Sequence, residues 1–146
     1  MKRLTNLLAL PPADARLLLT AVAALLTARL LLRLWSIDRL RVWSGRLGSK
    51  PRQPPEDIVW AVQTATRRLP GTSCLASALA LQRLLARHGH SSEIHIGVAK
   101  ERRALAAHAW VVCDGRVLMD TEDHGAYTRL VAWPASDTTT LVRRDL

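Results

Sequence analysis

Apolar residues recur at helical spacing in the first part of the chain. The pattern predicts a long helix that begins near Ala15, after two prolines and with Asp14 as its cap. The apolar side of this helix continues through Ser36. It comprises Leu17, Val22, Leu25, Leu26, Leu30, Leu34 and Ile37.

Glycines, prolines and charges interrupt this pattern over residues 44–55, "SGRLGSKPRQPP". Such a composition is typical of a linker. The sequence therefore predicts an N-terminal helical segment over residues 1–50 and a second domain over residues 51–146.

Two further helices are predicted after the linker. The first, "EDIVWAVQTATRRL" at residues 56–69, opens on acidic residues, carries a partial apolar stripe and ends at a Pro-Gly pair. The second covers residues 74–88, and either Thr72 or Ser73 can cap it.

Toward the C-terminus the pattern changes to the alternation of strands. "SEIHIGV" places Ile94, Ile96 and Val98 on one face. "AHAWVV" and "RVLMD" predict two strands joined at Asp114-Gly115, and "YTRLVAW" predicts a last strand. Helices followed by an antiparallel sheet predict an α+β fold.

Composition and charge narrow the class of protein. Of the 146 residues 49% are apolar, enough for one compact domain with its own core. The 21 Lys+Arg against 12 Asp+Glu give a formal charge of +9, which favours acidic partners. The chain lacks a nucleic-acid motif, so no nucleic acid partner is expected. Cys74 and Cys113 have no CxxC spacing, which favours a reducing, cytoplasmic setting.

The N-terminal apolar run raises the question of a membrane span. "LLLTAVAALLTA", residues 17–28, holds 12 uncharged residues between two arginines, whereas a span needs about 20. Snorkelling of Arg29 and Arg33 would extend the run to Trp35, so a membrane helix stays open. We favour a buried helix, and we do not expect membrane association.

Three residues stand out as candidate catalytic groups: Cys74 at a helix start, His108 on a strand, and Asp120 at the end of the next strand. Thiol catalysis needs a thiolate, a nearby imidazole and a group that orients the imidazole. The N–H groups at a helix N-terminus stabilise both a thiolate and a developing oxyanion. Each residue taken singly also fits a structural role, as a core thiol, a surface histidine or a strand end.

The length of the hairpin loop decides whether His108 faces Asp120. With the Asp-Gly pair alone as the loop, His108 would lie opposite Thr121, and Asp120 would point to the other side of the sheet. With Cys113 added to the loop, His108 lies opposite Asp120 with Cβ atoms about 5 Å apart. We predict this three-residue loop.

Strand alternation also separates the two cysteines. His108 and Trp110 share one face of their strand, whereas Cys113 lies on the other. Cys113 is therefore predicted to be a packed strand residue, and Cys74 is the better nucleophile.

Other polar groups are weaker candidates. Three histidines could suggest a zinc site: His88, His90 and His95. They lack the paired spacing that zinc ligands usually have. Gln63 could donate to an oxyanion, although a surface role is favoured for it. Glu122 and Asp123 are alternative carboxylates beyond the strand. No metal and no cofactor are expected.

Two stretches together, "CLASALALQRLLARHGHSSEIHIGV" and "AHAWVVCDGRVLMD", resemble the transglutaminase-like leader peptidases of lasso-peptide biosynthesis in their stand-alone form. The resemblance covers about residues 56–133. It implies a papain-like, transglutaminase-like cysteine protease fold. It also implies Cys74 as nucleophile, His108 as general base and Asp120 as orienting acid.

The resemblance further implies a substrate and partners. Such enzymes remove the leader from a ribosomally made (RiPP) precursor, whose leader carries threonine at its penultimate position. They act with a separate small leader-recognition protein, the RiPP recognition element, and the lasso cyclase is a further expected partner. An acyl transferase and a non-catalytic accessory binding module stay open as alternatives.

Overall fold

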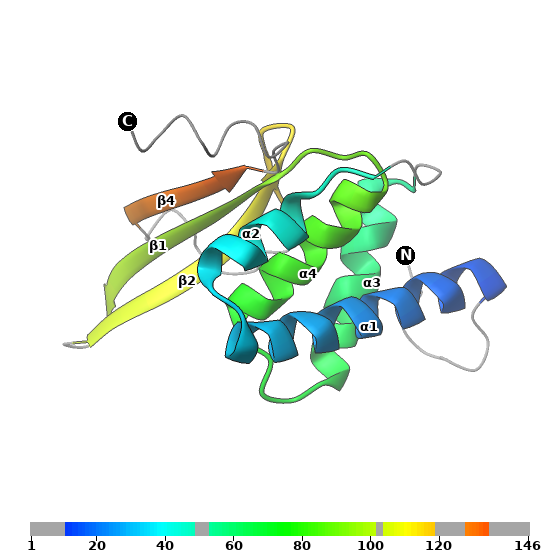
Figure 1. Ribbon diagram of the computed structural model, residues 1–146, viewed down its shortest axis with the longest axis horizontal. Coiled ribbons are helices and arrows are strands. Elements are labelled where there is room, and N and C mark those ends of the chain that lie inside the picture. The colour runs from blue at the N-terminus through cyan, green and yellow to red at the C-terminus, as the bar shows by residue number, and fades with distance from the viewer. Residues whose placement is uncertain (1–10, 49–52, 102–103, 119–127, 135–146) are drawn as a thin grey trace.

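The computed structural model describes residues 11–48, 53–101, 104–118 and 128–134, and within these ranges four helices precede four strands. The helices are α1 (Pro12–Leu34), α2 (Ile37–Gly45), α3 (Pro55–Arg68) and α4 (Cys74–Arg87). The strands are β1 (Glu93–Glu101), β2 (Ala104–Cys113), β3 (Arg116–Leu118) and β4 (Thr128–Pro134), in the antiparallel order β3-β2-β1-β4. The predicted α+β fold is confirmed (Figure 1).

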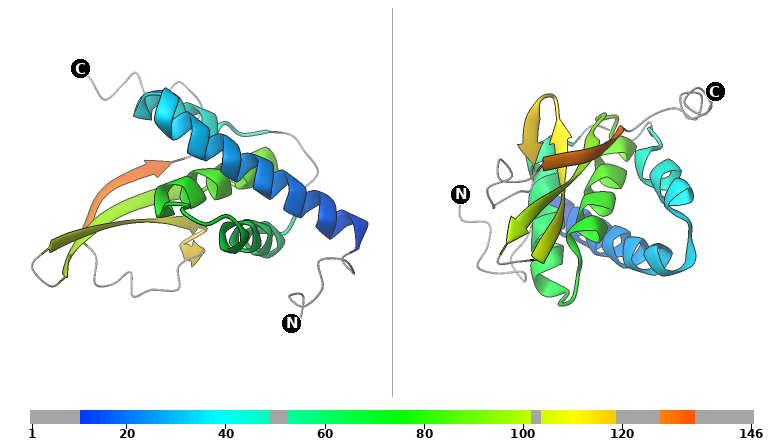
Figure 2. Two further views of the ribbon diagram at one scale, coloured as in Figure 1. Left: turned by 90° about the horizontal axis from the view of Figure 1, so that it is seen from below. Right: turned by 90° about the vertical axis from the view of Figure 1, so that its left-hand side faces the viewer.

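Helix α4 is the centre of the fold. It packs against the sheet through β2 and against the other three helices, which lie with it on one side of the sheet (Figures 1 and 2). Ten of its residues are buried, among them Leu79, Leu81, Leu84 and Leu85. A helix that is apolar around most of its circumference is typical of such a central position.

The ends of α3 and α4 follow from local sequence. Prolines stand before and at the start of α3, where a missing N–H costs nothing, and Glu56 and Asp57 favour its positive end. The α4 cap is Ser73, whose hydroxyl accepts from the N–H of Ala76 at 3.1 Å. Thr72, the other candidate for this cap, has a different role. Its hydroxyl donates to the carbonyl oxygen of Leu69 at 2.8 Å and so closes the turn that precedes α4.

Helix α1 buries a different side from the predicted one. Leu17 and Leu25 are buried as expected, but the rest of the buried side is formed by Ala21, Ala24, Ala28 and Leu31. The leucines expected to join them, Leu26, Leu30 and Leu34, are exposed. Alanines allow helix axes to approach closely, so the alanine side faces α3 and α4.

The start of α1 also differs from the prediction. The helix begins at Pro12, after Pro11 in the capping position, and no side chain caps it. Asp14 therefore lies in the first turn, where its charge favours the helix dipole, and is not the cap.

Helix α1 is long and apolar enough to cross a membrane by length and composition. A third (33%) of its most apolar window is buried against the protein. The prediction of a buried helix therefore holds for one side of α1 only. The other side exposes apolar residues.

Helix α2 was not expected. It includes Ser44 and Gly45, which the sequence had assigned to the linker. Leu40 of α2 belongs to the same hydrophobic core as α1, α3 and α4, and Arg41 lies over the ring of Trp133 in β4 at 5.4 Å. The division near residue 50 stays a prediction, but the described helices on both sides of it share one core.

Candidate active site

Cys74 is the first residue of α4, and its side chain is exposed. The N–H groups of the first helical turn have no acceptor within a helix. Ser73 satisfies the N–H of Ala76 by its side chain and that of Ser77 by its carbonyl oxygen. The N–H groups of Cys74 and Leu75 come before these and point out of the helix end, where they favour an anion.

Cys74 and His108 line one cleft of about 260 Å³. Its walls come from α3, α4 and β2. The lining residues are Gln63, Thr66, Arg67, Cys74, Ser77, His108 and Ala109. The structure thus brings together the predicted nucleophile and the predicted general base, which are 34 residues apart in sequence.

His108 is half-buried and is held by its neighbours on the sheet. Its ring stacks on Trp110 with centroids 6.1 Å apart and an interplanar angle of 24°. Trp110 in turn lies over Gly97 of β1, where a Cβ atom would stand only 2.9 Å from the indole. Gly97 therefore makes room for the aromatic side chain that supports the imidazole.

The hairpin between β2 and β3 differs from the prediction. Cys113 pairs with Arg116, so the loop has two residues, and the predicted three-residue loop is wrong. Asp114 (φ 51°) and Gly115 (φ 75°) both adopt left-handed conformations, as a type I′ turn requires. This turn is favoured because its twist matches that of the strands and because Asp and Gly tolerate positive φ.

The register that placed His108 opposite Asp120 is lost with this turn. Asp120 itself lies outside the described residues, as do Glu122 and Asp123. The orienting acid of the site therefore stays a prediction.

Cys113 is a packed strand residue, as predicted. It is buried, and its thiol donates to the carbonyl oxygen of Ser91 at 3.5 Å. Burial raises the pKa of the Cys113 thiol, and the charge of Asp114 raises it further. A buried neutral thiol is a poor nucleophile, so Cys74 is the reactive candidate of the two.

Gln63 lines the cleft, whereas sequence reasoning favoured a surface role for it. The turn at Pro70-Gly71 folds α4 back along α3, so residues at similar distances from the turn approach each other. The hydroxyls of Thr66 and Ser77 show this, because they lie 3.2 Å apart. Gln63 lies one helical turn before Thr66 on the same side of α3. Helical spacing counted back from the Pro-Gly turn could therefore have indicated that Gln63 lies in the cleft.

Two of the three histidines considered for zinc make contacts elsewhere. His95 lies 2.9 Å from the carboxylate of Glu93 and against Trp110, and His90 lies 2.7 Å from the carbonyl oxygen of Gln53. Within the described ranges, no three His, Cys, Asp or Glu side chains form a group that could hold a metal ion.

Comparison with models of known protein families gives a match. Residues 18–132 match the family model described as "Transglutaminase-like superfamily", which spans both α1 and the sheet. No curated protein and no solved structure matches the chain.

Proposed function

Because the chain belongs to the transglutaminase-like superfamily, we propose that it is a cysteine peptidase that removes the leader from a lasso-peptide precursor. Members of this superfamily are generally cysteine proteases or acyltransferases. One observation carries the choice of chemistry: an exposed thiol at a helix N-terminus and a strand imidazole line the same cleft. The choice of substrate rests on the resemblance of the two sequence stretches that contain these residues.

In the proposed mechanism, His108 takes the proton of the Cys74 thiol, and the thiolate attacks the scissile carbonyl carbon. The N–H groups of Cys74 and Leu75 bind the oxyanion of the tetrahedral intermediate. His108 then gives its proton to the leaving amine, which is the new amino terminus of the core peptide. Water, activated by the same imidazole, hydrolyses the thioester and releases the leader.

We assign Asp120 the role of orienting His108. The assignment rests on the resemblance alone. It predicts that Asp120→Ala lowers kcat by several orders of magnitude, whereas the neighbouring changes Glu122→Ala and Asp123→Ala leave kcat within a few fold. Equal loss in all three variants would remove Asp120 from the mechanism.

The proposed partners follow the same reasoning. A separate small leader-recognition protein presents the leader, and the lasso cyclase takes the product. The net charge of +9 suits an acidic leader, and the cytoplasm is the proposed setting because the thiol must stay reduced. The N-terminal helices are the proposed docking region for the recognition protein. Reversing the charges of Arg29 and Arg33 tests this, because unchanged affinity for that protein would contradict it.

The decisive experiment uses a lasso precursor encoded beside this chain, its recognition protein and the purified full chain. Mass spectrometry should show two fragments that together exceed the precursor by one water, with cleavage one residue after the leader's penultimate threonine. Cys74→Ala should abolish cleavage, and Cys113→Ala should retain it. Processing that survives Cys74→Ala would disprove the peptidase, and a product in which the leader is joined to an amine would indicate an acyl transferase.

A further inference from the structure

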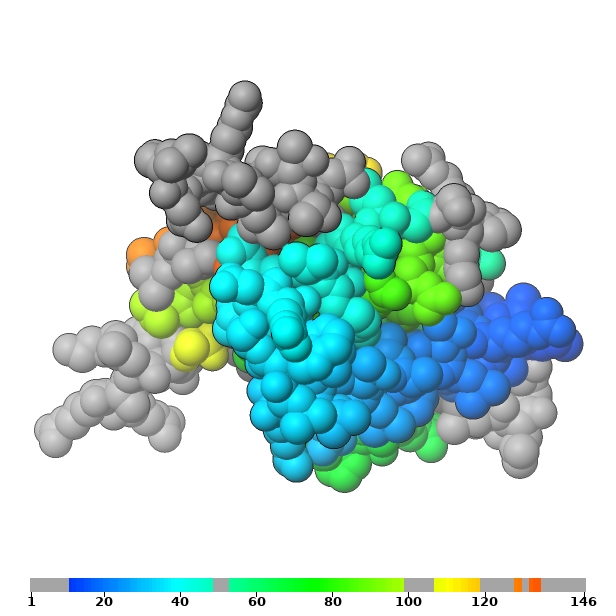
Figure 3. Space-filling view, viewed as in Figure 1, coloured from blue at the N-terminus to red at the C-terminus, as the bar shows by residue number. Residues whose placement is uncertain are grey.

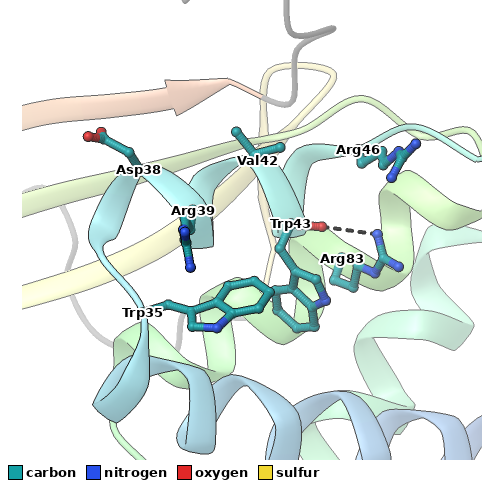
Figure 4. A pocket seen from close by; sticks show the side chains of 7 residues that line it. All are labelled: Trp35, Asp38, Arg39, Val42, Trp43, Arg46 and Arg83. Atoms are coloured by element: carbon teal, nitrogen blue, oxygen red, sulfur yellow. Dashed lines mark hydrogen bonds between the residues drawn. The ribbon is translucent and has the colours of Figure 1, made fainter.

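A second cavity lies on the other side of α4, between α4, α2 and the end of α1. Its volume is about 510 Å³, and none of its lining residues belongs to the cleft of Cys74 and His108. Figure 3 shows α2 in cyan beside the blue end of α1, on a face that looks toward the viewer. Figure 4 shows the side chains that line the cavity.

Two tryptophans form the apolar part of this cavity. Trp35 follows the last residue of α1, and Trp43 lies in α2, with Val42 beside it. Both indoles line the cavity (Figure 4). Trp35 is 38% exposed and Val42 is 40% exposed, so apolar surface at the cavity is open to a ligand.

Trp43 is held against α4 by Arg83. Nη1 of Arg83 in α4 donates to the carbonyl oxygen of Trp43 at 3.0 Å, and the guanidinium also lies 5.4 Å from the centre of its ring. This double contact joins α2 to α4. A guanidinium has five N–H donors, so Arg83 retains donors for an anion after this one bond.

Positive charge surrounds the tryptophans. Arg39, Arg46 and Arg83 line the cavity together with one carboxylate, that of Asp38. In Figure 4 the guanidinium of Arg39 points toward Trp35, whereas the carboxylate of Asp38 points away from the indoles. Burial lowers the pKa of the Arg83 guanidinium, and the nearby charges of Arg87 and Arg46 lower it further. This like-charge repulsion would be relieved by a bound anion.

The composition of the lining fits a large apolar side chain flanked by carboxylates. The lining side chains are Trp, Val, Arg and Asp. An aromatic or large aliphatic side chain needs only the indole faces and Val42 for contact. Carboxylates beside it match the fork geometry of arginine.

We propose that this cavity is a docking site for an acidic peptide segment of a partner protein, with one large apolar side chain as its anchor. The anchor packs against Trp35, Trp43 and Val42. Acidic residues on either side of it pair with Arg39, Arg46 and Arg83. Binding here is independent of chemistry at Cys74, so it stands or fails separately from the proposed peptidase reaction.

The test measures fluorescence anisotropy of a labelled peptide, Gly-Glu-Glu-Phe-Glu-Glu, on the purified full chain. We expect saturable binding that weakens about tenfold or more when Phe is replaced by Ala, and that is lost when the four Glu are replaced by Lys. Trp35→Ala and Arg39→Glu, both at exposed positions, should each weaken binding about tenfold. Arg68→Glu is the matched control, because Arg68 is exposed and lines neither cavity; it should change the affinity by less than about twofold.

A second measurement locates the binding site. With 15N-labelled tryptophan, the peptide should shift the indole N–H signals of Trp35 and Trp43 and leave that of Trp133 in place. Equal binding of the lysine peptide, or unchanged affinity in both Trp35→Ala and Arg39→Glu, would overturn the proposal. The proposal would also be overturned if oligo(dT) or phosphatidylglycerol vesicles bound more strongly than the acidic peptide and Trp35→Ala abolished that binding. Either result would identify a different class of occupant.

Discussion

Cys74 and His108 line one cleft, although the thiol belongs to the first turn of α4 and the imidazole to the middle of a strand. Their meeting follows from the packing of α4 against β2. The second thiol, that of Cys113, lies at the end of the same strand as His108 but is buried and bonded to Ser91. The two cysteines therefore occupy chemically different environments.

The first prediction concerns their reactivity. Iodoacetamide at neutral pH should alkylate Cys74 and leave Cys113 unmodified, because Cys74 is exposed and the pKa of the buried Cys113 thiol is raised. Peptide mass spectrometry after a brief reaction measures both sites. Cys113→Ala should still gain one adduct and Cys74→Ala none, and both thiols should react in denaturant. Equal modification of both cysteines in the folded chain would contradict the prediction.

The second prediction assigns Gln63 to the oxyanion and rests on the proposed reaction. Its side chain lines the cleft with Cys74, so its amide can donate to the oxygen of the tetrahedral intermediate. Gln63→Ala should lower kcat on the order of 100-fold with little change in KM, because the bond forms in the transition state.

The matched measurement for Gln63 is alkylation of Cys74. Its rate should be the same in Gln63→Ala as in the unaltered chain, since the amide serves the intermediate and leaves the thiol unaffected. A loss that appears wholly in KM would indicate that Gln63 binds substrate and has no role in catalysis.

The helices and strands that carry the site were predicted better from the sequence than was the way in which they pack together. Periodicity located α3, α4 and the strands, and the cap of α4 could be narrowed to two residues. Cys74 and His108 were found because each stands at a recognisable local position, a helix start and an alternating strand. Gln63 was undervalued because its place in the cleft depends on how α4 folds back on α3.

Two errors have separate physical causes. On α1 the sequence pattern ranked Leu26, Leu30 and Leu34 above the alanines, but close packing of helices favours small side chains at the contact. At the hairpin, one more residue in the loop would have changed the register of the two strands. The positive φ of Asp114 distinguishes the two-residue loop from the three-residue loop. Hydrophobicity alone determines neither.

The third prediction tests that turn. Gly115→Ala should lower the free energy of unfolding by about 1 kcal/mol, because alanine is disfavoured at φ 75°. An added Cβ would meet no atom within 4 Å, so this cost is purely conformational. Asp114→Asn should be neutral and Asp114→Val destabilising, since Asn tolerates left-handed backbone and Val does not. Urea denaturation measures all three, and a neutral Asp114→Val would argue against the two-residue turn.

The fourth prediction concerns pH. The thiol of an unfolded chain ionises near pH 8.5, whereas the pKa of Cys113 in the folded chain is raised by burial. Above that pH the unfolded state has lost a proton that the folded state keeps, so the free energy of unfolding falls until the folded-state pKa is reached. This fall should be shallower in Cys113→Ala between pH 7 and 10. Parallel curves for the two proteins would show that Cys113 does not contribute.

The fifth prediction concerns Gln82, whose side chain hydrogen-bonds three other segments of the chain. Its side chain is 1% exposed; its Nε2 donates to the carbonyl oxygen of Trp133 at 3.0 Å and to that of Ser92 at 3.3 Å. Its Oε1 accepts from the hydroxyl of Ser44 at 2.6 Å. One amide thus joins α4 to α2, to β4 and to the residue that precedes β1.

Gln82→Leu keeps the volume but leaves these buried groups without their partner. Each unsatisfied group costs about 1–3 kcal/mol, so we expect a loss of about 2–4 kcal/mol after partial relaxation. Ser44→Ala removes the bond to Gln82 and a longer contact of 3.3 Å to the carbonyl oxygen of Arg41, and it should cost about 1 kcal/mol. Gln63→Leu, the same change at a half-buried cleft position, should stay within about 0.5 kcal/mol. Equal effects of the two glutamine changes would show that Gln82 fills space without organising the core.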